Sequence, residues 1–253
     1  MRKSNVIFIL MGLISVIFLG TASAGQFGAP ELSADDKYIS VGGGYFYNAD
    51  KWTLKSNSKD YKYSQNQIYL QFSAASNNIE SYFRGGVADL KIDNAFAASS
   101  SDTNFNDDYK FFGIIGVKGF FSINRNFGIG VFAQGSFFPH YTSNANDLVS
   151  GIPETQELQI KDYGEADFGL TLQGKFDKIL LYAGPFCYWT HANLEATTTR
   201  AGLTTSSASS NFKQSNLGGV AGIKIPIVRK INIEFEGQYR HEFSGGGAII
   251  YSF

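Results

Sequence analysis

The sequence has 253 residues, with 21 Lys and Arg against 22 Asp and Glu, so its formal net charge at pH 7 is −1. This balance excludes a strongly basic protein that coats nucleic acid, and we expect no nucleic-acid partner. With 28 Gly, 5 Pro and the single Cys187, the chain is neither collagen-like nor a small domain held together by disulfides.

The first 24 residues have the features of a cleavable signal peptide. Arg2 and Lys3 form a basic start, residues 6–19 are nearly all apolar, and residues 21–24 (Thr-Ala-Ser-Ala) offer small residues for cleavage. An apolar helix over 6–19, at about 1.5 Å per residue, is shorter than the ~30 Å hydrocarbon core of a bilayer, so a cleaved leader is favoured over an uncleaved anchor. The sequence therefore predicts export, a periplasmic lead-in over 25–37 and one domain over 38–253.

From Tyr38 onward the chain alternates strand-like runs with turn or loop sequence. Period-2 alternation and abundant Phe, Tyr, Ile and Val indicate β-strands, and no amphipathic helical stretch of useful length occurs. Ten strands are predicted, at 38–48, 66–74, 80–92, 108–121, 127–138, 161–174, 179–192, 213–225, 231–243 and 247–253.

The links between these runs alternate in length. The long, polar links are 49–65, 93–107, 139–160 and 193–212. The short links are 75–79, 122–126, 175–178 and 226–230, and the final link, 244–246, is also short. This alternation is expected of an up-and-down β-barrel with long loops outside the cell and short turns in the periplasm.

Most runs have one apolar and one polar face. In the run 231–243, Ile231, Ile233 and Phe235 alternate with Asn232 and two glutamates. A soluble barrel with a dry core would fit this alternation, but Lys or Arg facing lipid at mid-depth costs about 2–4 kcal/mol, which explains an apolar face without charge. We therefore assign the polar face to the lumen. The resulting ion-pair network is predicted to contain Arg84, Lys110, Lys118, Glu165, Asp167, Lys224, Glu234, Glu236 and Arg240, with Lys224 opposite Glu234 across a hairpin.

Several runs depart from simple alternation. Phase is lost at 87–89, which predicts a β-bulge or the membrane boundary. The run 179–192 is apolar on both faces, so its orientation stays open. Pro185 and Pro226 lack ladder donors and require a bulge or an unpaired position.

The last run, Ala248-Ile249-Ile250-Tyr251-Ser252-Phe253, places Ile249, Tyr251 and Phe253 on one face. In this strand the sequence resembles the outer-membrane β-barrel family of Gram-negative bacteria, whose closing strand typically ends in Phe after alternating apolar or aromatic residues. The resemblance implies an all-β, ten-stranded, antiparallel up-and-down transmembrane barrel in the outer membrane, in contact with its lipid. It also implies that the barrel-assembly machinery recognises Tyr251 and Phe253.

The motifs of known barrel enzymes are absent from the sequence. Omptin proteases use an Asp-x-His pair, whereas Phe138, Trp189 and Tyr239 stand two residues before His140, His191 and His241. The sequence also has no His-x-Ser of the lipid A deacylase kind and no His-x-x-x-His metal spacing. We expect a protein without catalytic activity, metal or cofactor.

The long links remain as the predicted functional surface. Exposed loops often carry binding, so we expect a surface structural, adhesion or ligand-binding role, as in opacity-type barrels. The alternative is a narrow channel for small solutes, because small barrels fill their interior with side chains and exclude a wide pore. A hydrolase at the rim, built on the three histidines, is a third hypothesis.

Overall fold

The computed structural model describes residues 38–54, 59–96 and 103–253; the predicted leader (1–24) and lead-in (25–37) lie outside them. The described residues form eleven strands: β1 Tyr38–Leu54, β2 Lys59–Ser76, β3 Ile79–Ile92, β4 Phe105–Ser122, β5 Phe127–Phe138, β6 Tyr141–Val149, β7 Ile152–Phe176, β8 Ile179–Arg200, β9 Leu203–Val228, β10 Ile231–Tyr239 and β11 Phe243–Ser252. Within these ranges, no helix has the length and apolar character needed to cross a membrane.

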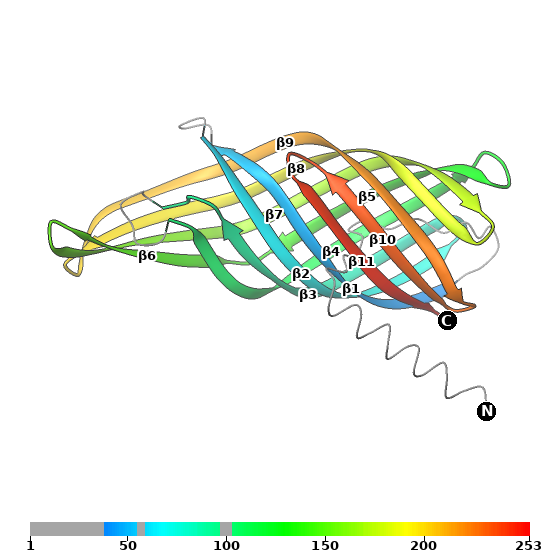
Figure 1. Ribbon diagram of the computed structural model, residues 1–253, viewed down its shortest axis with the longest axis horizontal. Coiled ribbons are helices and arrows are strands. Elements are labelled where there is room, and N and C mark those ends of the chain that lie inside the picture. Colours follow the sequence, from blue (N-terminus) through cyan, green and yellow to red (C-terminus); the bar gives the residue numbers. More distant parts are fainter. Residues whose placement is uncertain (1–37, 55–58, 97–102) are drawn as a thin grey trace, which may run out of the picture.

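The strands form one closed antiparallel sheet (Figure 1). Its order is β5-β4-β3-β2-β1-β11-β10-β9-β8-β7-β6, and a further pairing of β5 with β7 closes the ring. The pairing of β1 with β11 joins the first described strand to the last, from Ser40 opposite Ser252 to Tyr47 opposite Gly245. The predicted antiparallel up-and-down barrel is confirmed.

The difference between ten predicted and eleven observed strands arises at Pro139. β5 and β6 lie one after the other along β7, β5 opposite 163–174 and β6 opposite 152–160. Pro139 has no N–H to donate, and on the opposite strand Asp162 has a positive φ of 51° beside a register shift. The wall therefore has ten positions in the described residues, and β6 is a second segment of the fifth.

Much of the sequence predicted as long loops is strand, and this part of the prediction was wrong. β7, β8 and β9 contain 25, 22 and 26 residues, so most of 139–160 and 193–212 belongs to β-hairpins. The hairpins turn at Ser150–Gly151 and Ala201–Gly202, where φ is positive. Thr-rich polar segments pair readily as strands, and a tight turn between them lets the ladder continue beyond the barrel. Figure 1 shows these hairpins as an arm that projects beyond the wall at the end away from the C-terminus.

Apolar side chains face outward along the wall, and polar side chains face inward. Ile115, Leu172 and Leu217 are 70%, 70% and 72% exposed, whereas Gln71, Glu165 and Glu236 are buried. The orientation of the seventh predicted run is also clear, because Tyr182, Phe186 and Tyr188 of β8 are buried inside and Trp189 lies outside. The apolar faces therefore do not meet in a dry core.

The predicted irregularities have structural counterparts. The register between β3 and β4 shifts between Ala88 and Leu90, which confirms the bulge. Pro226 lies beside a register shift between β9 and β10, and Pro185 lies where the β7–β8 ladder is interrupted. At this interruption a Cβ on Gly184 would lie 1.9 Å from the Leu170 carbonyl oxygen, so only glycine permits this close approach.

Candidate functional site

The barrel interior contains ion pairs between neighbouring strands. Lys224 of β9 and Glu234 of β10 face each other, as predicted, with 3.3 Å between Nζ and Oε1. Lys118 of β4 lies 3.5 Å from Glu80 of β3. All four side chains are buried or nearly so. Glu80 was not among the predicted residues, although it shares a strand face with Arg84 at the start of β3.

Arg240 is at the centre of the most buried cluster of charges. Its guanidinium donates two hydrogen bonds of 2.6 Å to the Glu165 carboxylate and lies 3.4 Å from Asp167. Gln134 donates a hydrogen bond of 2.9 Å to Asp167, and the Tyr188 ring lies 4.3 Å from the guanidinium. These ions are excluded from water, so each depends on its partners for compensation.

Two further predicted residues also contact the polar side chains of this interior. Arg84 donates a 2.7 Å hydrogen bond to Gln71 and lies between the rings of Tyr69 and Tyr82, at 5.0 and 4.8 Å. Glu236 accepts a hydrogen bond of 2.7 Å from the hydroxyl of Tyr182.

Lys110 differs from the other predicted charges because its side chain is 42% exposed. It pairs with Asp107 at 3.4 Å on the same strand, close to the start of β4. The structure therefore places Lys110 at the outer rim and not within the buried clusters.

The three histidines lie on separate parts of the wall. His241, between β10 and β11, places Nδ1 2.7 Å from the buried Asp50 carboxylate and 3.3 Å from the Tyr188 hydroxyl. His140 lies 2.5 Å from Thr142, and His191 lies on β8. In the described ranges no three His, Cys, Asp or Glu gather as a metal site would require.

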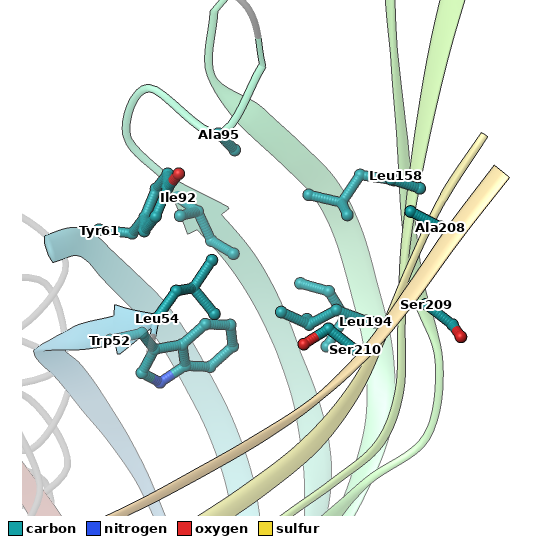
Figure 2. Close-up of a pocket in the computed structure, with 12 residues that line it drawn as sticks. Trp52, Leu54, Tyr61, Ile92, Ala95, Leu158, Leu194, Ala208, Ser209 and Ser210 are labelled. Atoms are coloured by element: carbon teal, nitrogen blue, oxygen red, sulfur yellow. The ribbon is translucent and has the colours of Figure 1, made fainter. Parts of the chain in front are cut away.

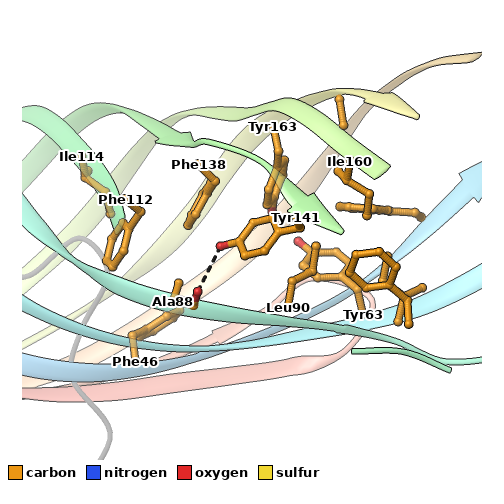
Figure 3. Packing of buried hydrophobic residues seen from close by; sticks show 14 of the residues in the cluster. Phe46, Tyr63, Ala88, Leu90, Phe112, Ile114, Phe138, Tyr141, Ile160 and Tyr163 are labelled. Carbon is orange, nitrogen blue, oxygen red and sulfur yellow. Dashed lines mark hydrogen bonds between the residues drawn. The ribbon is translucent and has the colours of Figure 1, made fainter. Parts of the chain in front are cut away.

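An aromatic cluster fills the interior beyond the ion pairs. Trp52 contacts Tyr63 and Phe212, with ring centroids 4.7 and 5.2 Å apart. Phe138 stacks on Tyr163 at 4.7 Å and on Phe112 at 5.4 Å. Figure 3 shows Phe112, Phe138 and Tyr163 of this cluster converging from different strands into the interior. The interior is therefore filled by buried charged side chains and aromatic rings.

An apolar pocket of about 240 Å³ lies beside this cluster, where the strands extend into the arm. Trp52 belongs both to the cluster and to the pocket lining, and Figure 2 shows aliphatic side chains surrounding the space next to it. The lining contains no charged residue and consists of Trp52, Leu54, Tyr61, Ile92, Ala95, Leu158, Ile160, Leu194, Ala196, Ala208, Ser209 and Ser210.

This pocket was not predicted, because most of its lining lies in segments predicted as loops. The missed signal was again alternation: Trp52 and Leu54, Leu158 and Ile160, and Leu194 and Ala196 are each two residues apart. Such spacing is expected of one strand face. Six strands, β1, β2, β3, β7, β8 and β9, carry those faces toward one another at the pocket.

No protein-family model matches the sequence, and no curated protein matches it. The chain resembles the translocator domain of autotransporter NalP from Neisseria meningitidis at 8% identity and a TM-score of 0.48, over 88% of this chain and 91% of that one. It resembles the outer membrane protease OmpT from Escherichia coli at 11% identity and a TM-score of 0.44, over 88% and 99%. The chain also resembles the CymD monoaromatic hydrocarbon channel at 8% identity and a TM-score of 0.36, over 87% of this chain and 88% of that one.

Proposed function

We propose that the protein is an integral β-barrel of the outer membrane that binds a small, uncharged, apolar molecule at its outer end. The membrane location is supported by the outward belt of apolar side chains, of which Phe72, Ile115 and Leu172 are examples. Soluble monomers rarely expose contiguous apolar patches larger than a few hundred Å². An apolar outer face and a charged interior are together expected of a barrel surrounded by lipid.

The observation that carries the ligand proposal is the apolar pocket. A dry apolar cavity of about 150 Å³ holds a benzene molecule, so a pocket of 240 Å³ accommodates a somewhat larger hydrocarbon. Its polar side-chain groups are the hydroxyls of Tyr61, Ser209 and Ser210 and the indole N–H of Trp52, and none of them carries a charge. Such a lining rejects ions, because a buried charge without a partner is costly.

Bromobenzene, a heavy-atom quencher of tryptophan fluorescence, tests this binding directly. The sequence has two tryptophans, so the Trp189→Phe variant leaves Trp52 in the pocket as the reporter. We expect saturable quenching in this variant. Adding Ala208→Phe, which fills the pocket, should weaken the apparent affinity at least tenfold.

Ser207→Phe is the matched control, since Ser207 is the neighbour of Ala208 on β9 but does not line the pocket. It should leave the quenching curve unchanged and so correct for bromobenzene dissolved in the lipid. Linear, non-saturable quenching in the parent, or equal curves for the two Phe variants, would contradict the ligand proposal.

The narrow channel is disfavoured by the filled interior. The Arg240 cluster and the aromatic cluster that contains Phe112 and Trp52 both occupy the lumen. We therefore expect no steady single-channel steps from the refolded protein in planar lipid bilayers. Regular conductance steps that recur across preparations would favour the channel instead.

The proposal also includes recognition of the C-terminal strand by the assembly machinery and adhesion through the projecting hairpins. Tyr251 and Phe253 lie exposed near the end of β11 with ring centroids 5.0 Å apart, where the assembly machinery would recognise them. The β8–β9 hairpin, exposed along 203–211, is the surface through which adhesion would act. We propose no catalytic role.

A further inference from the structure

A shallow hollow of about 570 Å³ lies on β7, β8 and β9, where the barrel wall begins to extend into the arm. All the residues that line it come from these strands and the adjacent β5, so it is a depression in one stretch of wall. Two rows of paired residues cross it: Gly164, His191 and Lys213 in one, and Ala166, Trp189 and Ser215 in the other.

The shape of the hollow follows from side-chain size. Gly164 and Ala166 on β7 present almost no side chain, whereas Trp189 on β8 is large and 50% exposed. The indole therefore forms one side of a depression whose base is the backbone of β7. An aromatic face beside a flat, open base suits the glycerol or sugar part of a lipid headgroup.

The polar groups at the hollow favour an anion. Lys213 is exposed, and its ammonium has no ion-pair partner in the described part of the chain. The Nδ1 atom of His191 is buried and has no hydrogen-bond partner there. Buried polar atoms normally have partners, so an orphaned one marks a place where a ligand group is expected. Glu165, the one acidic residue in the lining, accepts two 2.6 Å hydrogen bonds from Arg240. The Asp162 carboxylate accepts a 2.8 Å hydrogen bond from Asn193, so both carboxylates are already engaged.

The hollow also lies at the boundary of the apolar belt. One row closer to the belt, Phe168 and Leu217 are exposed apolar residues, and one row beyond the hollow Asn193 pairs with Asn211. Tryptophan concentrates at this membrane–water boundary, where lipid headgroups lie. The geometry points to a binding site for the phosphate-bearing headgroup of an anionic lipid, with Lys213 and His191 facing the phosphate and Trp189 packing against the rest of the headgroup.

This inference rests on the proposed membrane location but not on the apolar pocket. Its test uses the Trp52→Phe variant, in which Trp189 is the only tryptophan. The protein is inserted into phosphatidylcholine vesicles that contain a small mole fraction of lipid brominated near the headgroup. We expect brominated phosphatidic acid to quench Trp189 at least twofold more than the same fraction of brominated phosphatidylcholine.

In a variant that carries both Lys213→Gln and His191→Gln, the two brominated lipids should quench Trp189 fluorescence equally. Lys178→Gln is the control, because Lys178 lies in the turn between β7 and β8 at the opposite end of the same strands, and it should preserve the excess. Added inorganic phosphate should not abolish the excess; if it does, the site is one for free phosphate and the lipid assignment is wrong.

Different outcomes test the lipid site and the membrane location. Equal quenching by both lipids in the parent, or an excess that survives the double substitution, would overturn the lipid site while leaving the membrane location intact. No quenching by either lipid would contradict the membrane location itself. If Trp52→Phe prevents folding, judged by loss of heat-modifiable gel mobility, the same comparison uses the natural sequence, in which the buried Trp52 adds a constant background.

Discussion

Replacing Arg240 with Met is expected to destabilise the barrel by about 3–5 kcal/mol, the typical effect of removing one member of a buried charge cluster. Arg240 donates two 2.6 Å hydrogen bonds to Glu165 and also contacts Asp167, and all three side chains are excluded from water. Without the guanidinium, two buried carboxylates remain side by side with no cation. Their repulsion and lost solvation both disfavour the folded state.

The loss of stability is measured as the difference in the free energy of unfolding in urea between the parent protein and the Arg240→Met variant, both folded into lipid vesicles. A triple variant that also carries Glu165→Gln and Asp167→Asn should recover most of the loss, because no uncompensated charge then remains. As a rim control, Glu242→Gln removes a partner of Lys51 and Lys62, whose pairs are partly exposed, and should change stability by less than about 1 kcal/mol. An Arg240 effect as small as the rim effect would mean that water reaches the cluster.

Leu170→Arg is the second large prediction, with an expected loss of about 2–4 kcal/mol in lipid vesicles. Leu170 faces outward in the part of β7 that pairs with β5, and Val131 is its partner across the ladder. If this face contacts acyl chains, the guanidinium must either enter hydrocarbon or distort the bilayer to reach water. Either response disfavours the folded, inserted state.

Leu148→Arg is the matched control for this substitution. Leu148 lies on β6 in the projecting arm and is 68% exposed, more than Leu170, so solvent exposure alone cannot explain a selective effect at Leu170. In the arm the new charge faces water, and the change should stay within about 0.5 kcal/mol. Equal, small effects at both positions would contradict the membrane location.

The closed barrel could be predicted from sequence because its main signal is local. Side chains of a strand alternate between its two faces, so Glu234 and Glu236 separate from Ile233 and Phe235 by position alone. The same rule places Lys224 opposite Glu234, since only the short link 226–230 lies between their strands, and the ion pair of 3.3 Å agrees with it. Proline and the loss of phase at 87–89 likewise located bulges, because each is a property of a few consecutive residues.

Features that depend on residues distant in the sequence could not be predicted from local alternation. The extent of β8 and β9 was underestimated, since a Thr- and Ser-rich segment is equally compatible with a loop until a neighbouring strand offers its backbone. The orientation of β8 stayed open for the same reason, as both its faces are apolar and only the closed wall separates inside from outside.

The sequence by itself determined the strand number of the wall, the inward charges and the outward apolar belt, because all three follow from period-2 alternation and link length. Only the tertiary structure decided that Arg240 pairs with Glu165, 75 residues away, and that six strands converge on one apolar pocket. The physical reason is that period-2 alternation fixes which face of a strand a side chain occupies. The closure of the barrel and the stagger of its strands fix which distant faces come together.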